Sequence, residues 1–321
     1  MKSWVVLFVA LVLLGWVFVD FTFFFDHSLG APKDVVIPKG MSLSGVARLL
    51  EEEGITSSFR FLVFALLSRK TTPIAGQYRL WPGMPVASIV RLLSQGPPRV
   101  RVTFPEGFTA EQMAEVLERL GVCGKEEYLA FVAHPEHFAR PWLSGVKSLE
   151  GFLFPDTYFL QVPTPPEEVI AVQLDRFEEL VLPLFSGKEA SFLESIVLAS
   201  IVEKETRLRE EKPLVASVFL NRLRKNMRLQ SCATVVYALK KEKGVSVTSL
   251  RERDLIFPSP FNTYLHEGLP PHAICNPGLD AIRAVLEPAQ TDYLYFVLQE
   301  DGKHAFARTY EEHLRNKRGA P

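Results

Sequence analysis

A unit of extended segment, Pro-Gly turn and short apolar helix occurs three times in the first 121 residues, and this repeat constrains the fold most strongly. The extended segments read V-V-I, Y-R-L and V-R-V-T-F. The turns that follow them are Pro38-Lys39-Gly40, Pro82-Gly83 and Pro105-Glu106-Gly107. Strand and helix signals that alternate over such short distances predict an α+β fold made of small units.

The helices of the three copies share one apolar face. Aligned on their glycines, the copies place apolar residues at three equivalent positions, i, i+3 and i+4: Val46, Ile89 and Met113; Leu49, Leu92 and Val116; Leu50, Leu93 and Leu117. This spacing is typical of an amphipathic helix. Ser42 and Thr109 are expected to be N-caps. Gly54, Gly96 and Gly121 are expected to end the helices.

Two interpretations of the repeat remain open. The copies are either compact packing units, or they bind ligand, because strand–helix pieces of this kind resemble LysM-type modules, which bind glycans that contain N-acetylglucosamine. The first two copies are expected to form one LysM-like domain, residues 32–98. Pro97-Pro98 interrupts the chain there. The third copy would then open a second domain, residues 99–321.

The amino terminus carries a long apolar run from Trp4 to Phe25, interrupted by Asp20. A helix of roughly 22 residues rises about 33 Å, enough to cross the hydrocarbon core of a bilayer. Lys2 precedes the run, which favours a cytoplasmic start and an exported remainder. We expect residues 1–31 to hold a short cytoplasmic stub and a single-pass transmembrane anchor. A cleaved signal peptide is the alternative, but the bulky F-T-F-F-F segment is a poor cleavage site.

Composition excludes several functions. The formal net charge is −1 and no polybasic stretch is present, so nucleic acid is not an expected partner. The three cysteines, Cys123, Cys232 and Cys275, are widely spaced and form no CxxC motif. His134 and His137 lie three residues apart, but Pro135 disfavours a helix between them. We therefore expect no metal site and no cofactor.

The second half of the chain predicts longer helices. Residues 188–205 and 210–224 each read as one helix, with Pro213 in the first turn of the second, and residues 280–286 read as a shorter one. A proline-rich loop runs from Pro258 to Pro277. The alternating segments Y-L-Y-F-V and H-A-F-A-R, joined by E-D-G-K, predict a closing β-hairpin. The expected second domain is mixed α+β.

Glu203 occupies the apolar face of the helix predicted at 188–205. It lies seven residues after Ile196, while Ala199 and Ser200 lie three and four residues after it. The small Ala199 and Ser200 would leave space beside the carboxyl group, and burial would favour its protonated form, as a general acid requires. The alternative is a helix-end glutamate held by a neighbouring Lys or Arg. Glu205 is expected to face solvent.

Two further segments combine polar and aromatic side chains. L-E-G-F-L-F-P-D-T-Y places Glu150, Asp156 and Tyr158 among bulky apolar residues. The proline-fixed loop S-P-F-N-T-Y offers the Asn262 amide and the Tyr264 hydroxyl. Such groups suit a polar, extended ligand such as a sugar chain.

These segments, with A-S-I-V-E-K-E-T, M-R-L-Q, N-P-G and Y-L-Y-F-V, resemble in sequence and in order the MltG/YceG-like endolytic murein transglycosylases. The resemblance covers nearly the whole chain. It implies a bitopic inner-membrane enzyme that cuts nascent peptidoglycan strands outside the cytoplasm, with Glu203 as the catalytic acid and peptidoglycan synthases as possible partners. Glu150, Asp156, Tyr158, Gln230, Asn262 and Tyr264 are the expected substrate-binding residues.

The resemblance also implies a reaction that needs one acid. The C6 hydroxyl of N-acetylmuramic acid attacks its own anomeric carbon and forms a 1,6-anhydro ring, so no water is activated. A hydrolase of the same bond, with a second essential carboxylate such as Asp156, and a non-catalytic glycan-binding scaffold remain alternatives. One position departs from the family pattern: Cys232 stands where relatives carry aspartate.

Overall fold

The computed structural model describes residues 30–187 and 191–318. They divide into two compact units, one formed up to Val100 together with Gln161–Pro163, the other by Arg101–Leu160 and Thr164 onward. Each unit has its own hydrophobic core, so each is considered separately.

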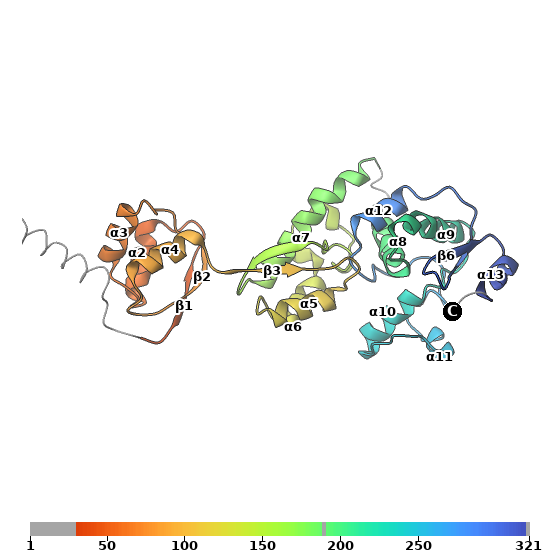
Figure 1. The fold of residues 1–321 in the computed structure, drawn as a ribbon, viewed down its shortest axis with the longest axis horizontal. Helices are drawn as coiled ribbons and strands as arrows, with labels where there is room; N and C mark the ends of the chain where they lie inside the picture. The colour runs from red at the N-terminus through yellow and green to blue at the C-terminus, as the bar shows by residue number, and fades with distance from the viewer. Residues whose placement is uncertain (1–29, 188–190, 319–321) are drawn as a thin grey trace, which may run out of the picture. The chain divides into compact units, whose positions relative to one another are not determined.

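The first unit packs three helices against a two-stranded sheet (Figure 1). Strands β1 and β2 pair antiparallel, with Val35 opposite Tyr78. Val35, Tyr78 and Leu80 are buried and face the helices, while alternate residues such as Arg79 face solvent. The elements in chain order are β1 (Lys33–Ile37), α2 (Leu43–Glu52), α3 (Ser58–Leu67), β2 (Gly76–Leu80) and α4 (Val86–Gln95). Helix α3 was not predicted from the sequence.

The threefold repeat is confirmed, as β1–α2, β2–α4 and, in the second unit, β3 (Arg99–Thr103) followed by α5 (Ala110–Arg119). The first aligned position is fully buried in every copy: Val46, Ile89 and Met113. The Ser42 and Thr109 hydroxyls cap α2 and α5, as predicted. The terminal glycines also behave as expected, because each has a positive φ that places it in a conformation unfavourable for other residues: Gly54, Gly96 and Gly121.

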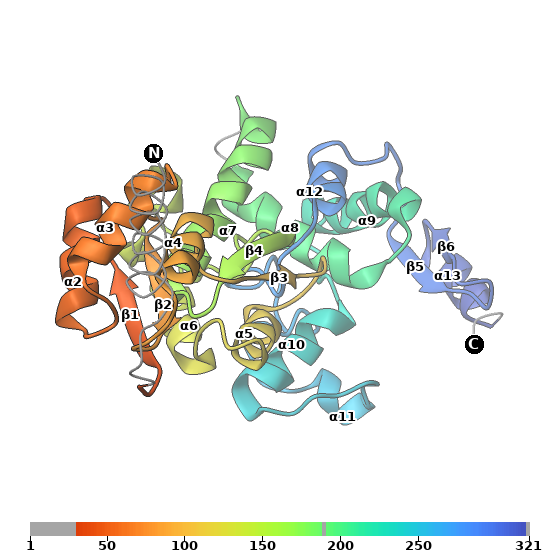
Figure 2. The ribbon, with the colours of Figure 1, turned by 60° about the vertical axis from the view of Figure 1, so that its left-hand side comes forward.

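The second unit is mixed α+β, as expected, and some of its helices pack against α8 (Figures 1 and 2). The remaining elements are α6 (Lys125–Val132), β4 (Thr157–Gln161), α7 (Pro166–Leu180), α8 (Phe192–Glu205), α9 (Lys212–Arg224), α10 (Cys232–Lys243), α11 (Glu252–Leu255), α12 (Leu279–Leu286), β5 (Tyr295–Leu298), β6 (His304–Ala307) and α13 (Tyr310–Lys317). Strand β3 pairs with β4. Helices α6, α7, α11 and α13 were not predicted from the sequence.

Helix α8 is buried because its sequence is apolar around most of its circumference. Ile196, Leu198, Ile201 and Val202 point in different directions and are all at most 2% exposed. A helix of this kind has to be covered on several sides. Helices α9, α12 and α10 pack against it. This packing fixes the position of its last turn, where Glu203 lies.

The closing hairpin is confirmed. Strands β5 and β6 pair antiparallel, with Tyr295 opposite Ala307 and Leu298 opposite His304. Gly302 lies in the turn with φ +79°. The E-D-G-K segment therefore forms the turn that the sequence predicted.

The predicted transmembrane anchor, residues 1–31, lies almost entirely outside the described residues. Among residues 30–187 and 191–318, no helix has both the length and the apolar composition that a membrane span requires. The anchor and the likeness of residues 32–98 to LysM-type modules stay predictions.

Candidate active site

Glu203 lies in the last turn of α8, on the face that the periodicity predicted. Its side chain is 8% exposed. Ile196, Ala199 and Ser200, on the same face, are fully buried. Gly107, in the turn before α5, packs against it, since a Cβ on Gly107 would lie 3.4 Å from Glu203 Cγ. The Glu203 side chain is therefore enclosed by its own helix, α8, and by the turn at Gly107, two segments that are far apart in the chain.

Two donors hold the Glu203 carboxylate. Lys212 Nζ lies 2.9 Å from Oε1 and 3.0 Å from Oε2. The Gly278 N–H donates to Oε2 at 3.1 Å. The carboxyl group is therefore bonded to a charged donor as well as buried among apolar residues. The structure thus shows the alternative weighed from the sequence, a glutamate held by a basic residue.

Glu106 is a second carboxylate at this centre, and the sequence did not identify it as a site residue. Its Oε2 lies 3.7 Å from Lys212 Nζ. Partial burial and the neighbouring Glu203 carboxylate raise the pKa of Glu106. One signal was available, because the third repeat carries an acid between its Pro and Gly where the first repeat carries Lys39.

Lys212 was also missed, although the sequence contains a signal for it. Its side chain is 5% exposed and it is the first residue of α9. A cation at the amino end of a helix is disfavoured by the helix dipole. A buried one needs a carboxylate partner. Lysine directly before Pro213 therefore indicated a special environment.

The space that Ala199 and Ser200 leave is filled by the chain, which corrects the expectation of an opening beside Glu203. The Ser200 hydroxyl donates to Val197 O at 2.7 Å and accepts from the Ile274 N–H at 3.0 Å. Cys275 Sγ lies 3.2 Å from Ser200 O. These bonds position the segment that delivers the Gly278 N–H to Glu203.

Glu150 is buried beside this segment. Its carboxylate accepts from the Ala110 N–H at 2.9 Å, at the start of α5, and from Asn276 Nδ2 at 2.9 Å. Burial raises the pKa of Glu150 to about 8, partly offset by these hydrogen bonds. The Asn276 amide oxygen accepts from the backbone N–H groups of Gly151 and Leu153. In this arrangement Glu150 joins α5 to the segment before Gly278.

Asp156 and Tyr158 also contact protein groups. Asp156 accepts from Arg176 Nε at 2.8 Å and from the Thr157 N–H at 2.7 Å. The Tyr158 hydroxyl is buried and donates to Phe154 O at 2.6 Å. Burial, with the nearby Asp156 carboxylate, raises the pKa of Tyr158. Their predicted sugar contacts stay predictions.

Gln230, Asn262 and Tyr264 lie on two loops that are bonded to each other. The Gln230 N–H donates to Thr263 O at 3.1 Å, and the Gln230 side chain is exposed, with φ +50° at its backbone. Asn262 is fully buried and its amide donates to Leu255 O and Phe257 O. Asn262 therefore shapes the loop, whereas Gln230 is accessible to a ligand.

Tyr264 and Cys232 meet between these loops. The Tyr264 hydroxyl lies 3.1 Å from Cys232 Sγ. Burial, followed by the Cys232 thiol, raises the pKa of Tyr264. Cys232 is exposed and begins α10. The position that departs from the family pattern therefore still makes a polar contact.

Glu205 does not face solvent, which contradicts the expectation from the helical wheel. It accepts a hydrogen bond from the Ser231 hydroxyl. Burial raises the pKa of Glu205. The loop that carries Gln230 and Cys232 is thereby bonded to the end of α8, two residues from Glu203.

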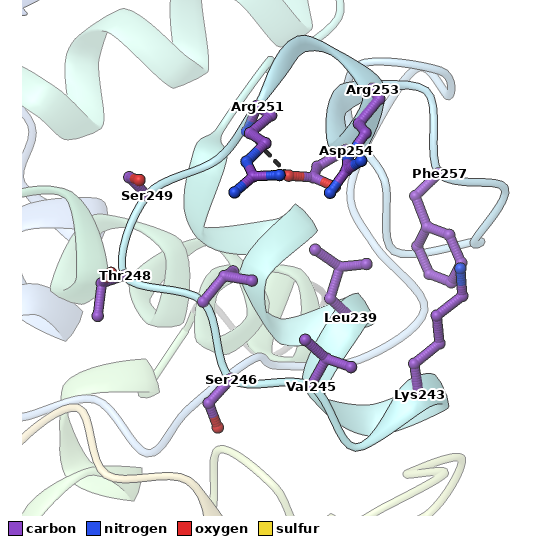
Figure 3. A pocket seen from close by; sticks show the side chains of 11 residues that line it. Leu239, Lys243, Val245, Ser246, Thr248, Ser249, Arg251, Arg253, Asp254 and Phe257 are labelled. Carbon is purple, nitrogen blue, oxygen red and sulfur yellow. Dashed lines mark hydrogen bonds and ion pairs between the residues drawn. The ribbon is translucent and has the colours of Figure 1, made fainter.

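A pocket of about 600 Å³ lies between the end of α10, the loop that follows it and α11 (Figure 3). Its lining includes Lys243, Arg251, Arg253, Asp254 and Phe257. None of the predicted site residues lines it. The candidate active site is therefore the carboxylate cluster at the end of α8.

Comparisons with known proteins identify the family of the chain. The YceG-like family model matches residues 35–319. Proteins named endolytic murein transglycosylase are 31% identical over 314 residues in Streptococcus pneumoniae serotype 2 and 30% over 304 in Bacillus subtilis. Each alignment covers 88% of this chain; it covers 57% of the Streptococcus protein and 83% of the Bacillus protein.

A solved structure is also similar. The crystal structure of a YceG-like protein from Listeria monocytogenes superposes with a TM-score of 0.61 at 30% identity, covering 89% of this chain and 99% of that one. The family match extends over nearly all the described residues. The chain belongs to the YceG-like family.

Proposed function

We propose that this protein is a membrane-anchored lytic transglycosylase that cleaves peptidoglycan strands internally, at the β-1,4 bond between N-acetylmuramic acid and N-acetylglucosamine. The observation that carries the proposal is the nearly buried Glu203 carboxyl group at the end of α8, held by Lys212 and the Gly278 N–H. Family membership and the activity for which the Streptococcus and Bacillus relatives are named support it.

The chemistry proposed for Glu203 is a single proton cycle. As the acid, Glu203 gives its proton to the glycosidic oxygen while the bond to the anomeric carbon breaks. The C6 hydroxyl then attacks that carbon and closes the 1,6-anhydro ring, and the Glu203 carboxylate takes the hydroxyl proton. The acid is regenerated and no water is consumed. Between the two steps the Gly278 N–H stabilises the carboxylate.

The remaining parts of the proposal concern location and ligand contacts. Residues 1–31 would anchor the protein in the inner membrane with a cytoplasmic start, and residues 32–98 would bind glycan. Residues 99–321 would form the catalytic domain, outside the cytoplasm and close to the synthases that extend the strands. Gln230, which is exposed, and Tyr264, which is half-buried, are the candidates for sugar contacts, and Glu150, Asp156, Tyr158 and Asn262 would support the surrounding loops.

The test is Glu203→Gln in the full chain, incubated with purified glycan strands and followed by mass spectrometry. We expect release of 1,6-anhydro ends to fall by roughly 10²–10⁴-fold, the usual contribution of a general acid. Glu194→Gln is the matched control, because Glu194 lies on the same helix and is exposed. The control should keep full activity.

The alternatives predict different results. Products with reducing ends instead of anhydro ends would identify a hydrolase. Strand binding without any cleavage by the wild-type protein would identify a scaffold. Unchanged anhydro products from Glu203→Gln would remove the basis of the proposal.

A further inference from the structure

We infer that Glu106 and Lys212 are positioning residues that control the protonation of Glu203, because Glu106 competes with Glu203 for the Lys212 ammonium group. The inference rests on the proposed function and deepens it. A general acid must carry a proton when the substrate is bound, yet Lys212 Nζ lies within hydrogen-bond distance of both Glu203 carboxyl oxygens, at 2.9 and 3.0 Å. Something must therefore draw the ammonium group away.

Glu106 is placed to do so. Lys212 Nζ lies 2.9 Å from the Glu203 carboxylate and 3.7 Å from that of Glu106. A small rotation of the lysine side chain would exchange one partner for the other. Lys212 is almost completely buried, so the ammonium group must keep a carboxylate partner wherever it moves. Glu106 provides that partner.

Gly278 brings the two carboxylates together. Its N–H donates to Glu203, and its Cα lies under the Glu106 carboxyl group, so a Cβ there would be 2.0 Å from the Glu106 carboxyl carbon. The backbone of Gly278 has φ −78°, which any residue can adopt. Glycine is therefore needed here for the room it leaves and not for its backbone conformation. The Glu106 carboxyl group occupies that room.

The other charged and titratable groups around Glu203 have different roles. Lys204 Nζ lies 3.3 Å from the Gly107 carbonyl oxygen. Asp280 pairs with Arg209 at 2.9 Å, and its carboxylate adds to the effects of burial and of Glu203 that raise the pKa of Glu106. Burial raises the pKa of the Cys275 thiol, which keeps it neutral. We therefore expect Glu106 and Lys212 to control the protonation of Glu203.

The charges of Glu106, Glu203 and Lys212 explain how binding of the substrate would move the Lys212 ammonium group from Glu203 to Glu106. Two carboxylates share one ammonium group, which leaves a net negative charge in a partly buried site. A glycan strand that displaces water makes this excess more costly, and uptake of one proton relieves it. With Lys212 on Glu106, that proton is held by Glu203, where the reaction needs it.

The test is the pH profile of strand cleavage by full-length variants. In Glu106→Gln, Lys212 has one carboxylate partner left and Glu203 stays ionised to lower pH, so the alkaline limb should move down by about one pH unit. In Lys212→Met, the cation is lost and the limb should move up by a similar amount. Glu210→Gln removes an exposed charge near α9 and should leave the limb in place.

Gly278→Ala gives a second test that removes no charge. Its methyl group would displace the flexible end of Glu106, so the alkaline limb should move in the same direction as in Glu106→Gln. Combined with Glu106→Gln, the same change should add no further shift. Circular dichroism and melting of each variant establish that it is folded.

Opposite shifts in the Glu106 and Lys212 variants would support the inference. An unmoved alkaline limb in folded Glu106→Gln, or an equal shift in Glu210→Gln, would overturn it and leave the proposed function intact, provided that Glu203→Gln is inactive. Carboxyl ¹³C NMR of the unliganded protein gives an independent readout, because the Glu203 signal should titrate at lower pH in Glu106→Gln than in the wild type.

Discussion

At the scale of single residues, the buried acidic side chains of the second unit differ in the groups that compensate their charge. Glu203 has Lys212, and Glu211 accepts from both the N–H and the ring of His304. Glu150 is bonded to neutral donors, the Ala110 N–H and the Asn276 amide. Because no cation contacts it among the described residues, Glu150 retains its proton to about pH 8, the value to which its pKa is raised.

This environment predicts a stability change with pH. The folded pKa of Glu150 is raised above its unfolded value, so between about pH 5 and 8 the folded state binds more protons and loses stability as pH rises. In Glu150→Gln this dependence should vanish. The wild type should therefore lose up to roughly 1.4 kcal/mol of unfolding free energy per pH unit relative to the variant.

Denaturant unfolding at a series of pH values measures this difference. Glu126→Gln is a suitable control, because Glu126 is exposed on α6. If the free energies of wild type and Glu150→Gln remain parallel from pH 5 to 8, Glu150 is ionised in the folded protein.

At the scale of elements, the active site depends on the contact between α8 and the segment that leads into α12. The central contact is the hydrogen bond that the Ser200 hydroxyl accepts from the Ile274 N–H. Two residues further on, Asn276 fixes the same segment to Gly151 and Leu153. Without these bonds the Gly278 N–H would have no defined position relative to Glu203.

Ser200→Ala should destabilise the protein and reduce cleavage together. The buried Ile274 N–H would lose its acceptor, at a cost of about 1–3 kcal/mol, and the Gly278 N–H would shift from Glu203. Urea unfolding and initial cleavage rates measure the two effects. Ser186→Ala removes an exposed hydroxyl and should change stability by less than about 0.5 kcal/mol. Wild-type stability in Ser200→Ala would show that another group satisfies the amide.

At the scale of the whole molecule, the two units have separate cores, and the proposed anchor precedes both. The core of the first unit contains Val46, Leu50, Ile89 and Leu93, contributed by α2 and α4. The second unit contains the complete Glu203 cluster: Glu106, Glu203, Lys212 and Gly278. Chemistry at Glu203 should therefore not require residues 1–31.

Removal of residues 1–31 should release the protein from membranes and leave its chemistry in place. We expect the shortened chain, residues 32–321, to appear in the soluble fraction and to form the same anhydro-ended products from purified strands. Fractionation and mass spectrometry test the two statements separately. Membrane association that survives the deletion would contradict the proposed anchor.

The local pattern of the chain determined much of this protein. Helical and strand periodicities specified the three repeats, the position of Glu203 relative to Ile196 and Ser200 on α8, and the closing hairpin, because these depend on residues a few positions apart. Helices α3, α6, α7, α11 and α13 were missed. Helix α13 is short and polar and shows no apolar face, whereas Ile170, Leu174 and Phe177 of α7 follow the spacing of an apolar helix face and were an available signal.

Only the tertiary structure decided what surrounds Glu203. Four contacts join segments that are distant in the chain or separately folded. They are the pairing of Glu203 with Lys212, the approach of Glu106 to Gly278, the packing of the 274–275 segment on Ser200, and the burial of Glu205 against Ser231. The sequence places a carboxyl group on a buried face. Whether that group carries a proton depends on the charges that packing brings to it, and no local spacing records those charges.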